Sequence, residues 1–95
     1  MLQYNFNPKP SKIKGLKLVQ LGMDGLHDIS QLDVYAKNPI SNSTENPIYT
    51  FSPNVGTDSV QVFNFISSDM FSELYLKIVV ILNLLLKDCS FIRTI

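Results

Sequence analysis

The stretch ELYLKIVVILNLLLKD, from Glu73 to Asp88, is the densest apolar run in the chain, and its structure decides how the rest is interpreted. Residues 67–69, Ser-Ser-Asp, are of the types that cap the N-terminus of a helix. Acidic residues then fall in the first turn and Lys87 falls in the last, where the helix dipole favours each charge. The pattern therefore predicts a helix over residues 69–88.

Most apolar residues of this helix would share one broad face, as in an amphipathic helix that covers a sheet. Leu76, Val80 and Leu84 depart from that pattern, because their spacing of four residues places them in a ridge through the polar face. Burial of a Leu or Val side chain contributes about 1.5 to 3 kcal/mol. The ridge is a candidate interface with another protein or a second copy of the chain. A tolerated set of exposed aliphatic residues, or cover by the C-terminal tail FIRTI (residues 91–95) folding back, is the simpler explanation.

Two other structures are compatible with the same run. Every even position from 74 to 86 is apolar, as on one face of a strand, although thirteen residues is long for a strand. A membrane span needs about 20 apolar residues, and Lys77 and Asn83 interrupt this run. Membrane anchoring by residues 70–87 is therefore a less favoured alternative.

The chain before residue 67 has the alternating pattern of short strands. Apolar and polar residues alternate with a period of two in several segments that are bounded by Pro, Gly and Asn. We expect strands near 2–6, 12–21, 32–36, 48–51 and 60–66, with a loop at 38–47. An Asp-Gly pair at 24–25 predicts a tight hairpin turn between the second and third strands. The predicted fold class is α+β: a small antiparallel sheet of four to five short strands, followed by one long apolar helix packed on it.

Length and composition are those of one small domain with a modest core. The 95 residues are 45% hydrophobic and 17% charged, and the formal net charge is zero. We expect a single domain at 1–95, with strands and loops in 1–66, a helix at 69–88 and a tail at 89–95. Low charge favours association, because little repulsion keeps copies apart. The scarcity of Ala and Arg is compatible with a phage, viral or mobile-element accessory protein.

Positive charge is concentrated near the N-terminus. Residues 1–17 hold no acidic residue and four lysines, which are Lys9, Lys12, Lys14 and Lys17. With the nearby rings of Tyr4 and Phe6, they are a candidate contact for an anion or a nucleic acid. Nucleic-acid binding is an alternative function, disfavoured by the zero net charge and the single Arg.

Residues capable of catalysis or metal binding are few. Asp24, His27 and Asp28 lie within five residues, but stable metal sites need three or four convergent ligands, and polar turn residues explain the cluster better. We predict no enzyme activity, no metal and no cofactor. Cys89 is the only cysteine, which excludes an internal disulfide, and the first residues lack a secretory pattern. We expect a cytoplasmic protein.

These observations together predict a non-enzymatic interaction protein. Its partner is expected to be another protein or a second copy of itself, bound through surfaces such as Leu76, Val80 and Leu84 and the strand near 59–66, whose two faces are both apolar. Nucleic acid and membrane are the less favoured partners.

Overall fold

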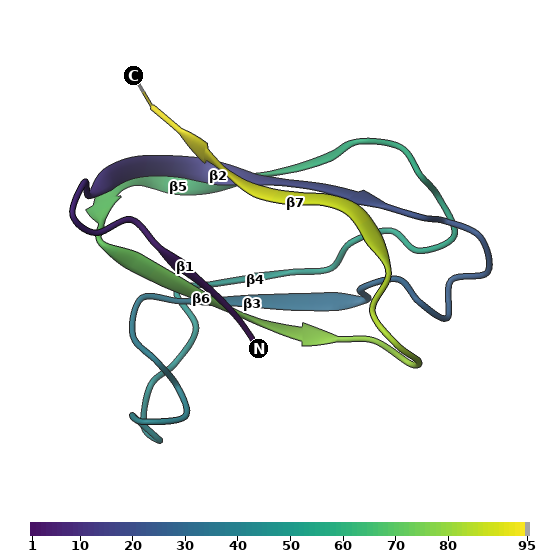
Figure 1. The fold of residues 1–95 in the computed structure, drawn as a ribbon, viewed down its shortest axis with the longest axis horizontal. Coiled ribbons are helices and arrows are strands. Elements are labelled where there is room, and N and C mark those ends of the chain that lie inside the picture. The colour runs from purple at the N-terminus through teal and green to yellow at the C-terminus, as the bar shows by residue number, and fades with distance from the viewer. Residues whose placement is uncertain (95) are drawn as a thin grey trace.

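The structure, a computed structural model, describes residues 1–94, and within them every regular element is a strand (Figure 1). The seven strands are β1 (Leu2–Asn5), β2 (Ser11–Gln20), β3 (Gln31–Tyr35), β4 (Tyr49–Phe51), β5 (Gln61–Phe71), β6 (Glu73–Val79) and β7 (Leu86–Arg93).

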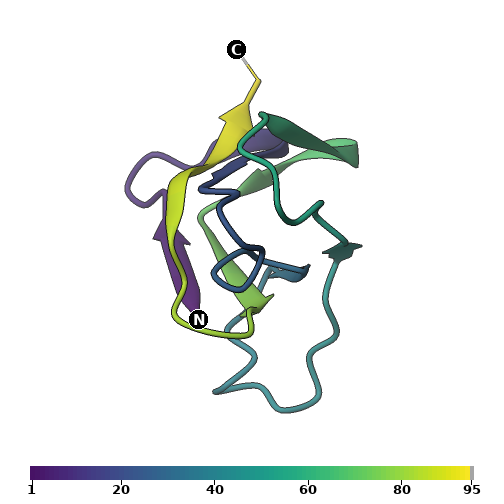
Figure 2. The same ribbon diagram turned by 90° about the vertical axis from the view of Figure 1, so that its right-hand side faces the viewer.

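The strands form two antiparallel sheets that pack on each other. One sheet has the order β1-β6-β3-β4 and the other has the order β5-β2-β7. The chain crosses from one sheet to the other at every connection except that between β3 and β4. This connectivity is that of a double-sheet jelly roll with seven strands in place of eight. In Figure 2, β1 and β7 lie on one side of the sandwich and β4 and β5 on the other.

The core lies between the two sheets and is aliphatic at its centre. Alternate residues of β2, β3 and β6 point inward and lose all contact with water, as expected for strands with one face on a core. Two aromatic residues complete the cluster at its margins. Its members are Phe6, Ile13, Leu16, Leu18, Ile29, Leu32, Val34, Phe65, Leu74 and Leu76.

The predicted helix at 69–88 is wrong, and so is the α+β class. These residues contain the end of β5, all of β6, a loop at 80–85 and the start of β7. β6 is paired on both edges, since Leu76 lies opposite Leu2 on β1 and opposite Val34 on β3. β1 pairs with residues 73–76 and β3 with residues 75–79, so each residue of β6 has a partner strand on at least one edge. This pairing overrides the helix preference of Leu.

The five strands expected before residue 67 are present, but their pairing differs from the prediction. Gly25 has a positive φ of 74°, as the expected turn requires. The turn does not close a hairpin, however, because β2 and β3 belong to different sheets. The single predicted sheet is therefore replaced by two.

Aromatic side chains close both open sides of the sandwich. On the β4/β5 side, Tyr49 stacks on Phe65 with ring centroids 4.2 Å apart, and Phe51 stacks on Phe63 at 5.0 Å. On the β1/β7 side, the rings of Tyr4 and Phe91 meet edge to face at 4.9 Å. The Tyr4 hydroxyl also donates a hydrogen bond of 2.9 Å to the carbonyl of Cys89.

The buried position of Leu76 gives a first prediction. Leu76 has no exposed surface, so Leu76→Ala should lower the free energy of unfolding by about 2 to 5 kcal/mol in a denaturant titration. Val79→Ala, on the same strand but half exposed, should change it by less than about 0.5 kcal/mol. Equal effects of the two substitutions would contradict the placement of β6 in the core.

The Tyr4 hydroxyl gives a second prediction, on the pH dependence of stability. Burial, with the hydrogen bond to Cys89, raises the pKa of Tyr4 above its ordinary value of 10.0. The unfolded chain therefore releases this proton at a lower pH than the folded chain. The contribution of Tyr4 to stability is fully present below pH 10.0 and declines as the pH rises above it.

We expect the free energy of unfolding of the wild type to fall more steeply above about pH 10 than that of Tyr4→Phe, which has no proton to lose. Denaturant titrations of both proteins at a series of alkaline pH values measure the difference. Parallel pH profiles would show that the folded state does not retain this proton.

Candidate functional site

Three loops meet at one end of the sandwich, at the right of Figure 1. They are the β2–β3 loop at 21–30, the β4–β5 loop at 52–60 and the β6–β7 loop at 80–85. Two backbone hydrogen bonds join the first loop to the third, from Leu82 to Leu26 at 2.9 Å and from Leu85 to His27 at 3.2 Å. His27 adds a third, since its Nδ1 lies 2.7 Å from the carbonyl oxygen of Asn83 and donates to it. These loops are held together as one unit.

A buried glutamine forms the base of this unit. Gln20 is the last residue of β2, and it has no exposed surface. Its amide Nε2 donates to the carbonyls of Ile29 and Asn54, both at 3.1 Å, and its Oε1 accepts from the N–H of Ile29. A buried amide is tolerated only where its hydrogen-bonding groups are satisfied. Gln20 therefore joins the β2–β3 loop to the β4–β5 loop from beneath.

A buried aspartate reinforces the same junction. The two carboxylate oxygens of Asp28 accept from the N–H of Gly22 at 3.4 Å and from the N–H of Gly56 at 2.8 Å. Both glycines have positive φ, and a Cβ on Gly22 would lie only 2.4 Å from the backbone of Thr57. The two loops thus touch backbone to backbone, an approach that requires glycine at this point.

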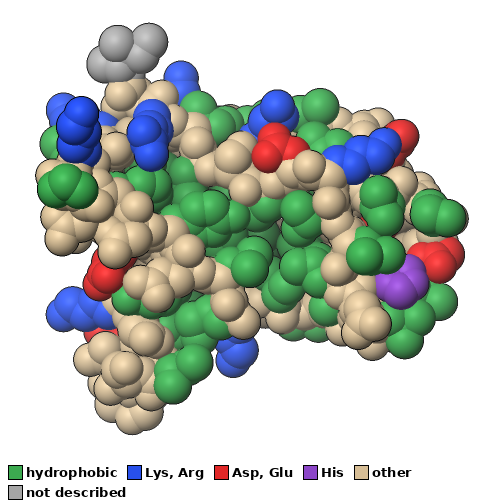
Figure 3. Space-filling model, viewed as in Figure 1, with side chains coloured by type: hydrophobic (Ala, Val, Ile, Leu, Met, Phe, Trp, Pro, Cys, Tyr) green, Lys and Arg blue, Asp and Glu red, His purple; other side chains and the backbone are tan. Residues whose placement is uncertain are grey.

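Above this polar base the loops carry exposed aliphatic side chains. Met23 and Ile81 are 83% and 72% exposed, and four others are between 39% and 50% exposed. We call this surface the apolar tip; it consists of Met23, Leu26, Val55, Ile81, Leu82 and Leu85. Figure 3 shows hydrophobic side chains gathered around the His side chain at this end of the molecule. The combination of fixed backbone and exposed apolar groups makes this end the candidate site.

The cluster of Asp24, His27 and Asp28 belongs to the same loops and organises them. Asp24 accepts from the N–H of Leu26 at 2.9 Å, while His27 and Asp28 make the bonds described above. Within residues 1–94, no three His, Cys, Asp or Glu side chains come together as a metal-binding group. These polar residues thus have structural partners in the loops.

The four N-terminal lysines lie along one outer surface. Lys12 and Lys14 are exposed on β2, and Lys9 is exposed in the turn before it. Lys17 pairs with Asp88 of β7 at 3.5 Å. The rings expected to lie beside them point elsewhere, since Tyr4 and Phe6 pack into the interior. The lysines are therefore not accompanied by the stacking rings that were predicted for a nucleic-acid contact.

The three residues of the predicted ridge do not share a surface. Leu76 is fully buried in β6, whereas Val80 and Leu84 are half-buried in the loop that follows. Without a helix, their spacing of four residues does not align them. Leu84 packs on the margin of the core beside the apolar tip.

The apolar tip itself was missed at the level of sequence. Ile81, Leu82 and Leu85 were assigned to the broad apolar face of the helix. A signal was nevertheless present, since Met23 and Leu26 flank the Asp-Gly turn, where apolar residues have no strand or helix pattern to explain them.

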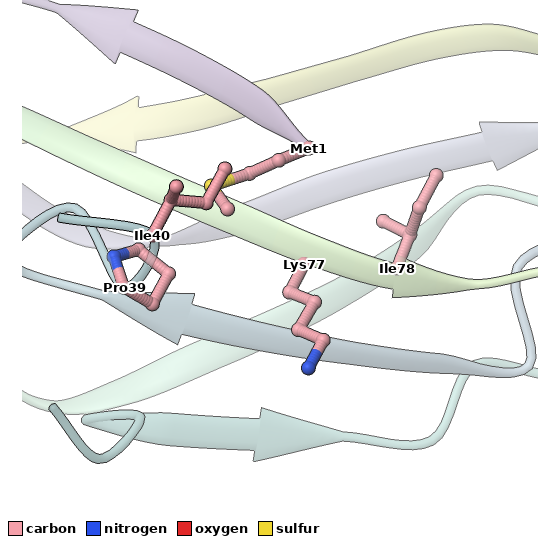
Figure 4. A pocket seen from close by; sticks show the side chains of 5 residues that line it. All are labelled: Met1, Pro39, Ile40, Lys77 and Ile78. Carbon is pink, nitrogen blue, oxygen red and sulfur yellow. The ribbon is translucent and has the colours of Figure 1, made fainter. Parts of the chain in front are cut away.

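An open hollow lies between β6 and the loop at 38–47, beside the N-terminus. It has a volume of about 400 Å³ and is lined by Met1, Pro39, Ile40, Lys77 and Ile78. In Figure 4, Met1 reaches toward Ile40, whereas the ammonium group of Lys77 extends away from both. The hollow therefore lacks convergent polar groups, which binding sites for small molecules normally contain.

Within residues 1–94 no helix has the length and apolar character needed to cross a membrane. Residues 70–87, the segment proposed as an anchor, are distributed over β5, β6, a loop and β7.

The base of the apolar tip gives a third prediction. Gln20→Met leaves the Ile29 N–H and two carbonyls without their partner, so it should lower the free energy of unfolding by about 1 to 3 kcal/mol or more. Gln61→Met is the matched control, because Gln61 bonds the same Asn54 in an exposed setting where water can replace it. We expect a change below about 0.5 kcal/mol for the control. Similar decreases in the free energy of unfolding of the two variants would show that the buried bonds of Gln20 stabilise the loops no more than the exposed bonds of Gln61 do.

No protein-family profile, curated protein or solved structure matches this chain. Its function is therefore inferred from the geometry of the apolar tip and of the sheet edges.

Proposed function

We propose that this protein is a non-enzymatic, self-associating interaction protein that binds a second copy of itself through the apolar tip. The observation that carries the proposal is the exposure of six aliphatic side chains on loops that are fixed from beneath by Gln20 and Asp28. Loops of ordinary domains are polar, and they bear binding residues where a rigid scaffold positions them. Exposed apolar side chains gathered on neighbouring loops in this way are typical of a contact with another molecule.

The rigidity of the loops favours binding. A partner that docks on a mobile loop must order it, which opposes association. Here the three bonds between the first and third loops, and the buried side chains beneath, already hold the backbone. Burial of the apolar groups therefore does not have to offset the cost of ordering these loops.

Charge is compatible with pairing of identical surfaces. The formal net charge is zero, so two copies experience no long-range repulsion. Asp24 and His27 are the ionisable side chains directly adjacent in sequence to residues of the tip, and both have hydrogen-bonding partners within the loops. A twofold arrangement would place the same aliphatic patch of each copy against the other.

We also propose that the protein has no catalytic activity and is located in the cytoplasm. His27 is the only histidine, and its Nδ1 supports the loop at Asn83. The single cysteine, Cys89, is a free thiol in the described structure, which suits a reducing compartment.

Self-association is measured by light scattering behind size exclusion across a series of protein concentrations. We expect the wild type to form a discrete dimer whose population rises with concentration. Ile81→Ser combined with Leu82→Ser should leave a folded monomer, because both side chains are exposed and contribute little to the core. Val62→Ser combined with Ile66→Ser, equally exposed on β5, should still dimerise.

Circular dichroism of each variant shows whether its fold is retained. A wild type that stays monomeric up to about 1 mM would contradict the proposal, because it leaves less than about 4 kcal/mol for association. Loss of the dimer in the β5 variant, but not in the tip variant, would place the interface on β5 and contradict the proposal.

A further inference from the structure

One sheet has four strands and the other has three, and the difference falls on the side where β1 and β7 meet. β1 is an edge strand of the four-stranded sheet, and β7 is an edge strand of the three-stranded sheet. They face each other through the edge-to-face contact of Tyr4 and Phe91 and lie together on one side of the sandwich in Figure 2. The four-stranded sheet thus extends one strand further than the sheet it covers.

The outer edge of β7 carries backbone groups that point away from the sheet. The N–H of Thr94 donates to the carbonyl of Lys12 on β2, so alternate residues from 94 back to 88 face β2. The N–H and C=O groups of Cys89, Phe91 and Arg93 face the other way. The hydroxyl of Tyr4 confirms this direction by donating to the Cys89 carbonyl. Within residues 1–94, β7 pairs with no strand other than β2.

The side chains of β1 that face the interior of the sandwich are less buried than their neighbours on β6. Leu2 and Tyr4 lie opposite Leu76 and Leu74 across the β1–β6 pair, on the face that looks into the sandwich. Leu74 and Leu76 have no exposed surface, but Leu2 and Tyr4 are only half-buried. The difference arises because, in the described part of the chain, β7 is the last strand of the opposite sheet on this side, and nothing beyond it covers Leu2 and Tyr4.

We propose that the outer edge of β7 accepts an extended segment of a partner protein as an eighth strand. Its backbone would bond to the N–H and C=O groups of Cys89, Phe91 and Arg93, in the mode known as β-augmentation. Every second side chain would point inward and cover Leu2 and Tyr4, so the segment must alternate apolar with polar residues. At present the Tyr4 hydroxyl donates to the Cys89 carbonyl, at the position where an N–H group of the added strand would donate.

The ends of β7 add a preference of charge. Lys87 and Arg93 are exposed at the two ends of the strand. The Lys87 ammonium already pairs with Asp58 at 3.5 Å, whereas the Arg93 guanidinium lies over the ring of Phe6. An acidic residue next to Arg93 therefore favours binding. This surface is separate from the apolar tip, so the two proposals stand independently.

The other outer edge of the same sheet is less suited to this role. On the β5 side, the Tyr49 hydroxyl accepts from the N–H of Ile66, and the stacked rings of Tyr49 and Phe65 fill the space between the sheets. Tyr49, Phe51 and Phe63 are also only half-buried there, but they are stacked together with Phe65, so an added strand would have to displace that stack to cover them.

The test uses a strand supplied at high effective concentration. A segment of alternating Val and Thr, about seven residues long, is joined to Met1 of the full chain through about ten Gly and Ser residues, whose reach is roughly 17 Å. Such a tether gives an effective concentration of about 1 mM. The matched control has the same linker, but each Val of the segment is replaced by Gly.

Amide hydrogen exchange followed by NMR reads out the edge residue by residue. We expect exchange at Phe91 and Arg93 to slow at least about tenfold relative to the control, with no such change at Gln61 to Asn64 on β5. Equal exchange in the two fusions, or slowing on β5 in place of β7, would overturn the proposal. Dimerisation through the apolar tip is measured separately by light scattering, so a negative result in one experiment does not decide the other proposal.

Discussion

Residues 73–79 form the strand that joins β1 to β3, and most features of the molecule depend on this pairing. β1 lies on one side of β6 and β3 on the other, with Leu74 and Leu76 directed into the core. Because the strand ends at Val79, the aliphatic residues that follow cannot remain in the sheet. They turn into the loop that contacts residues 26 and 27, and the chain then enters the other sheet as β7. One strand pairing therefore produces both the apolar tip and the position of the free edge.

The base of the apolar tip uses polar side chains where aliphatic ones would pack more simply. Gln20 and Asp28 are almost completely buried, and burial of polar groups is unfavourable unless every group is bonded. Their bonds go to backbone groups of two different loops, at Ile29, Asn54, Gly22 and Gly56. Aliphatic residues could fill the same volume but could not fix the direction of a loop backbone. The arrangement is therefore better suited to holding a surface in place than to increasing stability.

The sequence was informative about strands and misleading about the long apolar run. Alternation within residues 2–66 located five strands, because each has one face on the core and one toward water. The run at 73–88 contains a strand, a loop and the start of another strand, and its combined pattern imitates a broad helical face. Apolar residues at every even position from 74 to 86 indicated a strand, but the length of the run argued against one. Nothing local marked Val79 as the end of β6.

The predicted surface position of Leu76 was wrong for a related physical reason. Leu76 was predicted on a surface because a helix has an outer face at that position, whereas a strand directs the same residue into the core. Exposure of Ile81 and Leu82 depends on contacts with Leu26 and His27, which are more than fifty residues away in sequence. Lys12 and Lys14 lie on the outside, as strand alternation predicts, and Lys17 lies outside because the bulge between Ile13 and Gly15 shifts the alternation of β2 by one residue. Residues governed by local period were predictable, and residues governed by contacts between loops were not.

The two sides of the sandwich differ in how they are closed, and this difference bears on where the fold can accept another chain. Between β4 and β5, four rings stack nearly parallel and fill the gap with side chains from both edges. Between β1 and β7, a smaller edge-to-face contact and one hydroxyl bridge a wider sheet to a narrower one. The Tyr4 ring and hydroxyl belong to a strand of only four residues at an edge, which has few other interactions to hold it. The side closed by β1 is therefore the one that can rearrange at the smaller loss of packing.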